Sequence, residues 1–215
     1  MAMADIWPDG KAGGAAIGEW PWLNHTDLAR DAECFETPLW AVHAILDVEL
    51  LTPMVVDPCC GQGVLAKAAD QRGYHVFASD LYDWGYGASN VDFLENDDVL
   101  RFVPNATVFM NPPFSLAVDF VETAIKNGAR KVVCFQRLSW WSSAKRVPFW
   151  SHRPPNRIYV CTDRASCWRI DIPPHKRTGG TTTDHAWFVW ERGQPGGTQM
   201  GRISKAPSVS VPKCI

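Results

Sequence analysis

The amino-acid sequence predicts an α/β fold in which helices cover both faces of a mostly parallel β-sheet. Short β-branched runs alternate with segments of helical periodicity, and this alternation is typical of parallel sheets. Three of the expected strands end directly on a short polar residue, at Asp57, Asp80 and Asn111. Because ligands bind beyond the carboxyl ends of strands in such sheets, these three residues are the first candidates for a functional site.

The individual elements follow from local patterns along the chain. A first helix begins at Thr37-Pro38, since Thr caps helix N-termini and Pro suits the first helical position. A second helix opens at Gly61-Gln62-Gly63 and stops at Gly73, and Ser115 can cap a third. The expected strands are residues 54–56, 75–79, 107–110, 131–135, 157–161 and 185–190, and a fourth helix is expected over 139–147.

The length of 215 residues predicts one domain. Residues 1–25 are expected to form a loose lead-in, residues 26–192 the folded domain, and residues 193–215, rich in Gly, Pro, Ser and Thr, a disordered tail. No apolar run approaches the roughly 18–20 residues needed to cross a membrane. Seven cysteines without a Cys-x-x-Cys pair predict reduced thiols and no metal site, which favours a cytoplasmic protein.

Charge is divided unevenly along the chain. Residues 1–100 hold 4 Lys or Arg and 17 Asp or Glu, whereas residues 101–215 hold 17 and 6. Such asymmetry indicates a polyanionic partner, such as nucleic acid, on the basic side. The candidates for phosphate contact are Lys145, Arg146 and Arg164, and the candidates for base stacking are Trp140, Trp141, Trp150 and Trp168.

The segment DPCCGQG, residues 57–63, has the features of a ligand-binding turn between a strand and a helix. Its glycines permit a tight turn and let a ligand approach the backbone. Gly61-x-Gly63-x-x-Ala66 also fits the dinucleotide fingerprint, and Asp80 could accept hydrogen bonds from ribose hydroxyls. Taken alone, the loop is compatible with both NAD and S-adenosylmethionine.

The tetrapeptide Asn111-Pro112-Pro113-Phe114 directly follows an expected strand. Two prolines restrict the backbone there, so the Asn111 side chain and the Pro112 carbonyl are held at the strand end. These two oxygens could accept both protons of an exocyclic amino group, and Phe114 could stack on a base. This arrangement favours methyl transfer to an amino nitrogen, and a dinucleotide oxidoreductase has no use for it.

Together, DPCCGQG and NPPF resemble the S-adenosylmethionine-dependent amino-methyltransferases, especially stand-alone, phage-type N6-adenine DNA methyltransferases. The resemblance covers residues 33–192. It implies a Rossmann-like class I methyltransferase fold with seven strands, of which the last, residues 185–190, is antiparallel. It assigns catalysis to residues 111–114. The cofactor-binding residues that it implies are Thr37, Pro38, Asp57, Pro58, Cys59, Gly61, Gly63, Asp80, Leu81, Asp92, Phe93 and Asn111.

Two departures from the family bear on the substrate. Cys59-Cys60 replaces the usual small or acidic residues of the cofactor loop. Residues 162–186 are the only long segment between the last two expected strands, so a separate target-recognition domain is missing and short or relaxed sequence recognition is expected. The leading target is adenine N6 in DNA. The alternatives are adenine in RNA, glutamine in a protein, and a non-catalytic nucleic-acid-binding protein.

Overall fold

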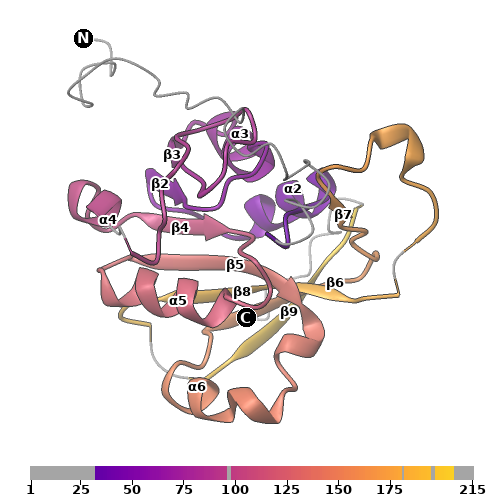
Figure 1. Cartoon of the computed structure of the whole chain (residues 1–215). Coiled ribbons are helices and arrows are strands. Elements are labelled where there is room, and N and C mark those ends of the chain that lie inside the picture. The colour runs from indigo at the N-terminus through magenta and orange to yellow at the C-terminus, as the bar shows by residue number, and fades with distance from the viewer. Residues whose placement is uncertain (1–31, 96–97, 181, 195–196, 206–215) are drawn as a thin grey trace, which may run out of the picture.

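The computed structural model describes residues 32–95, 98–180, 182–194 and 197–205. The expected lead-in over residues 1–25 lies outside this part of the chain. The main feature is a seven-stranded sheet with the order β3-β2-β4-β5-β8-β6-β9 (Figure 1). Its strands are β2 Met54–Asp57, β3 His75–Ala78, β4 Thr107–Met110, β5 Lys131–Arg137, β6 Arg157–Cys161, β8 His185–Glu191 and β9 Gln199–Ile203.

The strand directions confirm the mostly parallel sheet. β3, β2, β4 and β5 run parallel to one another, whereas β8 is antiparallel to both β5 and β6. β2 pairs with β3 on one side and with β4 on the other, so the chain changes direction across the sheet at β2. In open α/β sheets, ligands bind at such a switch point, beyond the carboxyl ends of the strands.

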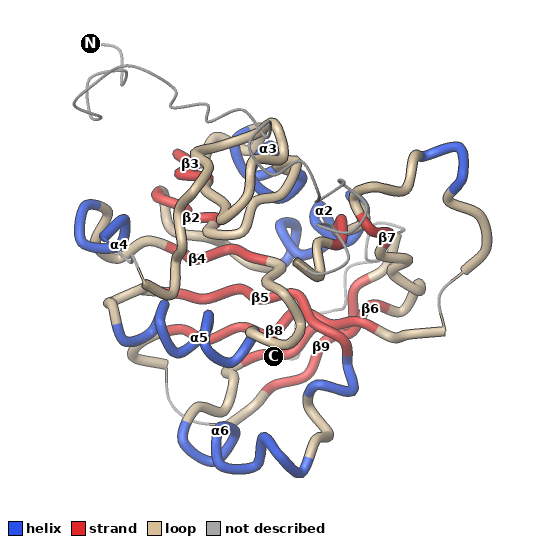
Figure 2. The backbone as a smooth tube through the Cα atoms, in the orientation of Figure 1, coloured by secondary structure: helices blue, strands red, loops and turns tan. Residues whose placement is uncertain are grey.

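Helices cover both faces of the sheet, as Figure 2 shows. One apolar layer lies beneath α2 and α3, and the other beneath α4, α5 and α6. Neighbouring residues of a strand alternate between the two layers: Val55 faces α2 and α3, whereas Val56 faces α5. The helices are α2 Leu39–Val48, α3 Val64–Asp70, α4 Asp98–Phe102, α5 Ala117–Lys126 and α6 Val147–His152. Among the described residues, no helix has the length and apolar character to cross a membrane.

The region around Pro148 differs from the expected helix over 139–147. Leu138–Trp140 and Ala144–Arg146 form 3₁₀ turns, and α6 begins only at Val147. Pro148 lies in the first turn of α6, where its missing N–H would have no helical partner in any case. The proline therefore begins a helix here instead of ending one.

The disordered tail expected from residue 193 onward is wrong for residues 199–203. These residues form β9, which pairs in parallel with all five residues of β6. Gly201 leaves room for the ring of Tyr159, and Ile203 is buried against the α2 layer. The Gly- and Ser-rich composition conceals this strand because its pairing depends on backbone groups and on one apolar side chain. The antiparallel strand β8 is accordingly the sixth strand of this sheet in chain order, and β9 is the last.

The segment between β6 and β8 forms an arm that projects from the body of the molecule (Figure 1). Its first part contains β7, Trp168–Arg169, which pairs with β1, Phe35–Glu36, in a separate two-stranded sheet. An ion pair between Arg177 and Glu36, at 2.7 Å, attaches the arm to β1 a second time. The arm is thus connected to the chain that precedes α2.

Candidate active site

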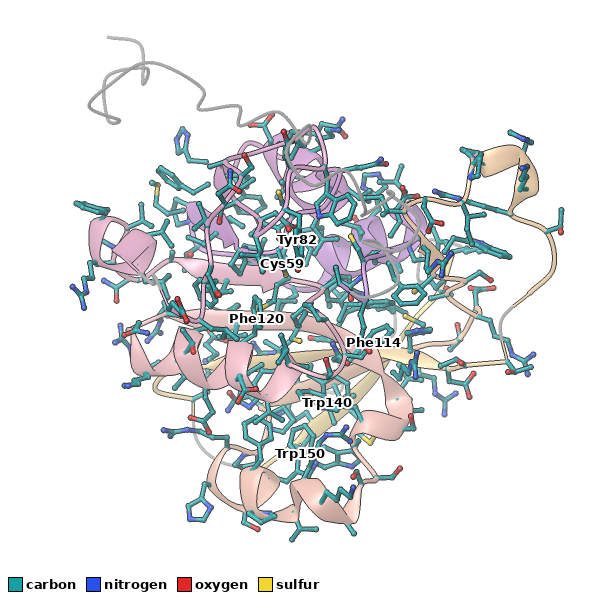
Figure 3. The ribbon with its side chains drawn as sticks, in the orientation of Figure 1. Cys59, Tyr82, Phe114, Phe120, Trp140 and Trp150 are labelled. Carbon is teal, nitrogen blue, oxygen red and sulfur yellow. The ribbon has the colours of Figure 1, made fainter. Side chains whose placement is uncertain are left out.

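A cleft opens at the carboxyl ends of β2, β3 and β4. It encloses about 940 Å³ when the space at its open mouth is included. Cys59 and Tyr82, which line it, lie close together in Figure 3. Of the expected cofactor-binding residues, those that line the cleft are Thr37, Asp57, Pro58, Cys59, Gly61, Asp80, Leu81, Asp92, Phe93 and Asn111.

The two remaining residues of that set, Pro38 and Gly63, do not line the cleft but shape its walls. Pro38 precedes α2, and its carbonyl accepts the first hydrogen bonds of that helix. Gly63 has a positive φ of 82° and precedes α3. A Cβ at this position would lie 2.3 Å from the ring of Tyr86, so Gly63 both makes the turn and admits that ring.

Asp57, the last residue of β2, carries a buried carboxylate without a partner. The residue is 1 % exposed, and neither side-chain oxygen has a hydrogen bond within the described part of the chain. Burial raises the pKa of Asp57 well above its usual range, and the nearby Asp80 adds to the shift. The backbone amides of Cys59 and Ala66 oppose it, but neither completes a hydrogen bond of good geometry. An unpaired buried carboxylate is costly, so the cleft is suited to a ligand with a cationic or N–H donor group.

Asp80, at the end of β3, ties two loops together. Its carboxylate accepts hydrogen bonds from the backbone N–H of Gly61 at 2.9 Å, the N–H of Tyr82 at 3.0 Å and the indole of Trp84 at 3.1 Å. Burial raises the pKa of Asp80 as well. A carboxylate has about four acceptor positions. Three are taken, which leaves room for one hydroxyl of a ligand.

The wall beside Asp92 is apolar. Phe93 is 2 % exposed and stacks on Phe120, with the ring centroids 5.5 Å apart. Asp92 accepts the backbone N–H of Leu94 at 2.9 Å through one oxygen, and its other oxygen has no hydrogen-bond partner among the described residues. Cys59 and Cys60 lie in the loop between β2 and α3, and burial is the largest cause that raises the pKa of both thiols. Both are therefore neutral thiols.

The Asn111 amide at the end of β4 has a defined orientation. Its nitrogen donates to the Phe35 carbonyl and to the Thr37 hydroxyl, each at 2.9 Å. Because a carbonyl can only accept, the nitrogen must face Phe35 and the Oδ1 oxygen must face away from it. Both N–H groups of Asn111 are used in this way. The group that Asn111 can offer a ligand is an acceptor.

The rest of the tetrapeptide is packed more tightly than expected. Pro112 is buried and does not line the cleft, and its carbonyl accepts a hydrogen bond from Gln136 Nε2 at 3.3 Å. The carbonyl keeps a second lone pair. Pro113 lines the cleft. Phe114 stacks on Phe35, with the ring centroids 5.5 Å apart, and the guanidinium of Arg137 lies 4.4 Å from the centre of its ring.

Residues 33–37 form a strap across the tetrapeptide. The Glu33 carboxylate accepts hydrogen bonds from the backbone N–H and the hydroxyl of Ser115, at 2.9 and 2.7 Å. Thr37 is 2 % exposed and contacts Asn111, and Glu36 pairs with Arg177 of the arm. The strap therefore connects the catalytic candidate Asn111, the start of α5 and the arm.

The residues expected to bind nucleic acid lie outside the cleft. Lys145 and Arg146 belong to a 3₁₀ turn before α6, and one N–H of Arg146 donates to the Trp140 carbonyl. Arg164 is exposed in the arm. Among the described residues, no Lys or Arg lines the cleft itself. Arg177 reaches the rim only through its ion pair with Glu36.

Three of the four tryptophans suggested as stacking platforms belong to an aromatic cluster instead. Trp140, Trp141 and Trp150 pack together and against Phe188 beneath β8. Figure 3 shows Trp140 and Trp150 one above the other, away from Cys59 and Tyr82 of the cleft. Trp168 lies in β7. The cluster fills the core next to α6, so these three rings are structural.

Sequence reasoning missed the contacts of Phe35 and Arg137 with the tetrapeptide and that of Glu33 with Ser115, which follows it. For Arg137 a signal existed, because it ends β5 at the same edge of the sheet where Asp57 ends β2 and Asn111 follows β4. The rule that singled out those two residues applies to Arg137 as well. For Phe35 and Glu33 the sequence carries no comparable signal.

Comparisons with known proteins support the fold. No family model matches the sequence, and no curated protein sequence matches it. A modification subunit assigned to a type I restriction enzyme of Vibrio vulnificus YJ016 is similar at a TM-score of 0.51 and 15% identity, over 82% of this chain and 48% of that one. At this identity the likeness shows a shared fold alone. With the strand order, it identifies a Rossmann-like fold of the class I methyltransferase type.

Two further structures are more distant. A predicted O-methyltransferase from Agrobacterium tumefaciens has a TM-score of 0.49 and 14% identity, over 81% of this chain and 91% of that one. TrmN from Thermus thermophilus has a TM-score of 0.39 and 17% identity, over 71% and 47%. The chain thus spans about half the length of TrmN and of the modification subunit. Likenesses below a TM-score of 0.5 add nothing to the fold assignment.

Proposed function

We propose that the protein transfers a methyl group from S-adenosylmethionine to an exocyclic amino nitrogen, with adenine N6 in DNA as the leading target. The orientation of Asn111 is the observation that supports this most directly. Its amide nitrogen is fully used by Phe35 and Thr37, so its oxygen is the group offered to a substrate. An acceptor held in place at a strand end is suited to an N–H donor.

The residues around Asn111 account for the choice of an amino group. The Asn111 oxygen accepts one N–H of the amine, and the free lone pair of the Pro112 carbonyl can accept the other. Two acceptors that hold both protons help the nitrogen to become tetrahedral, with its lone pair directed toward an incoming methyl group. Methylation then replaces one N–H bond by an N–C bond and releases a proton. No general base has to remove that proton before the new bond forms.

The cleft fits the proposed cofactor. S-adenosylmethionine supplies, when bound, a methyl group activated on a sulfonium. The unpaired Asp57 carboxylate provides a partner for its ammonium group, and the free acceptor position of Asp80 provides one for a ribose hydroxyl. The Phe93 wall can pack against the adenine ring, with Asp92 beside it to accept from the ring amine. A cationic ligand bound between them would also reduce the repulsion between Asp57 and Asp80.

The experiment compares three classes of substrate. DNA, RNA and a glutamine-containing peptide mixture are incubated with the protein and with S-adenosylmethionine labelled on the methyl group, and products are identified by mass spectrometry. We expect N6-methyladenine in DNA. Label found only in RNA would make RNA the substrate in place of DNA. Label found only on glutamine would make the substrate a protein in place of a nucleic acid. No labelled product, with no binding of S-adenosylhomocysteine by calorimetry, would refute the proposal.

Asn111→Ala tests the catalytic assignment within the same assay. Removal of one preorganised contact to the reacting group costs about 100- to 1000-fold in rate. The variant should bind S-adenosylhomocysteine nearly as well as the wild type, since the other cleft residues are unchanged. Asn127→Ala is the matched control, because this asparagine lies at the end of α5, and within the described part of the chain its side chain bonds only to the Thr123 carbonyl. Normal turnover by Asn111→Ala would remove Asn111 from the mechanism.

A further inference from the structure

Arg137 is a cation whose guanidinium contacts the tetrapeptide. It ends β5, its side chain is exposed, and its guanidinium lies 4.4 Å from the ring centre of Phe114. Among the described residues, no hydrogen-bond or ion-pair partner engages this guanidinium. The pKa of His185 is lowered mainly by burial, and the positive charge of Arg137 lowers it further. The side chain is therefore held by one cation–π contact.

The existing contacts of the Phe114 ring restrict where a base can stack on it. The ring contacts Phe35 and Arg137, so a base that stacks on it must replace one of these two partners. Phe35 is fixed by its pairing with Arg169 in the two-stranded sheet and by its hydrogen bond from Asn111. Arg137 has no comparable restraint. An exposed cation–π contact is also weaker than a base–aromatic stack.

We propose that Arg137 binds a phosphate of the target nucleotide once the target base has taken its place on Phe114. This inference rests on the proposed function, because it assumes that a nucleotide base enters beside Asn111. A planar guanidinium with unpaired N–H groups matches the oxygens of a phosphate and can bind it in a bidentate manner. The acidic lining of the cleft keeps the phosphate outside, at the edge where Arg137 lies.

The test uses fluorescein-labelled single-stranded oligonucleotides that contain one adenine. In one of them, the two phosphates next to the adenine are replaced by neutral methylphosphonates. Affinities are measured by fluorescence anisotropy with S-adenosylhomocysteine present. For the wild type we expect the neutral replacement to weaken binding about 10- to 100-fold, as for the loss of one charged hydrogen bond. Arg137→Ala should bind the normal oligonucleotide as weakly, and the replacement should then have almost no further effect.

Two variants complete the design. Arg137→Lys keeps the charge without the planar group and should retain part of the sensitivity. Lys126→Ala removes an exposed cation at the end of α5, at the opposite edge of the sheet, and should behave as the wild type. If Arg137→Ala remains as sensitive to the methylphosphonates as the wild type, or if the wild type is insensitive, Arg137 does not bind this phosphate. If the wild type binds no normal oligonucleotide, the proposed nucleic-acid substrate fails together with this inference.

Discussion

Replacement of Thr37 by valine removes one of the two acceptors that hold the Asn111 amide. Thr37 Oγ1 lies 2.9 Å from Asn111 Nδ2, and the residue is 2 % exposed, so valine fills the same space without the hydroxyl. One N–H of Asn111 then lacks a partner, and only the Phe35 carbonyl keeps the amide in place. An unpaired buried donor costs about 1–3 kcal/mol. If about 1–2 kcal/mol of this reaches the transition state, the rate falls about 5- to 30-fold.

A double-mutant cycle with Asn111→Ala separates this role from direct cofactor binding. If Thr37 acts through Asn111, Thr37→Val should have almost no effect in the Asn111→Ala background, because the amide that it orients is gone. Thr37→Ser should restore most of the rate, since it returns the hydroxyl. Single-turnover rates measure the effect on transfer, and calorimetry with S-adenosylhomocysteine measures the effect on affinity. Additive rate effects, or an affinity loss as large as the rate loss, would refute the reasoning.

Three further predictions concern Asp57, Gly63 and Lys145. Because the pKa of Asp57 is raised in the folded state, the free protein should lose stability as pH rises above about 4, the ordinary carboxyl pKa. Thermal denaturation should therefore show that Asp57→Asn becomes more stable relative to the wild type as the pH rises from 5 to 8. S-adenosylhomocysteine should not stabilise this variant. A stability difference between variant and wild type that does not change with pH would contradict the prediction. Gly63→Ala should cost about 1–3 kcal/mol more in urea unfolding than Gly179→Ala, whose similar φ has open space around it, and equal costs would dismiss the Tyr86 contact. Lys145→Ala should flatten the dependence of log affinity on log salt for duplex DNA by about 0.9, and an unchanged slope would exclude its phosphate contact.

The sequence allowed the position of the cleft to be predicted, but not the contacts that complete it. Asp57, Asp80 and Asn111 could be placed because each lies at or just after the end of a short strand, and parallel strands bring their carboxyl ends to one edge. The orientation of Asn111 depends instead on Phe35 and Thr37, which are more than 70 residues away in the chain. No periodicity or spacing encodes such a contact.

The edge strand β9 also could not be predicted from the sequence pattern. The burial pattern of β8 makes it recognisable as a strand, whereas β9 exposes most of its side chains. β9 depends on backbone pairing with β6 and on the buried Ile203. The basic residues were counted correctly along the chain, but their separation from the cleft follows from tertiary packing. Charge totals by segment therefore do not predict where the basic residues lie relative to the cleft.

The charge of the cleft leads to a last prediction, on how a substrate enters. Five acidic residues line the cleft, Glu33, Glu36, Asp57, Asp80 and Asp92, and no Lys or Arg does so among the described residues. A cationic cofactor suits this lining, whereas phosphates are repelled, so only the neutral base of a polynucleotide can enter. An adenine in a duplex must then leave the base stack to reach Asn111.

Single-stranded or mismatched adenine should therefore bind more tightly than paired adenine, because less unpairing is required. The difference is measured with duplexes that carry 2-aminopurine at the target position, together with S-adenosylhomocysteine. Fluorescence should rise on binding as the probe leaves its neighbours, although a new stack on Phe114 would reduce the rise. Phe114→Ala separates the two effects, since it should bind about 5- to 150-fold more weakly, equivalent to the loss of about 1–3 kcal/mol of stacking, yet give a brighter complex. A probe that stays quenched in both proteins at saturation would mean that the base remains in the duplex and that the acidic cleft does not receive it.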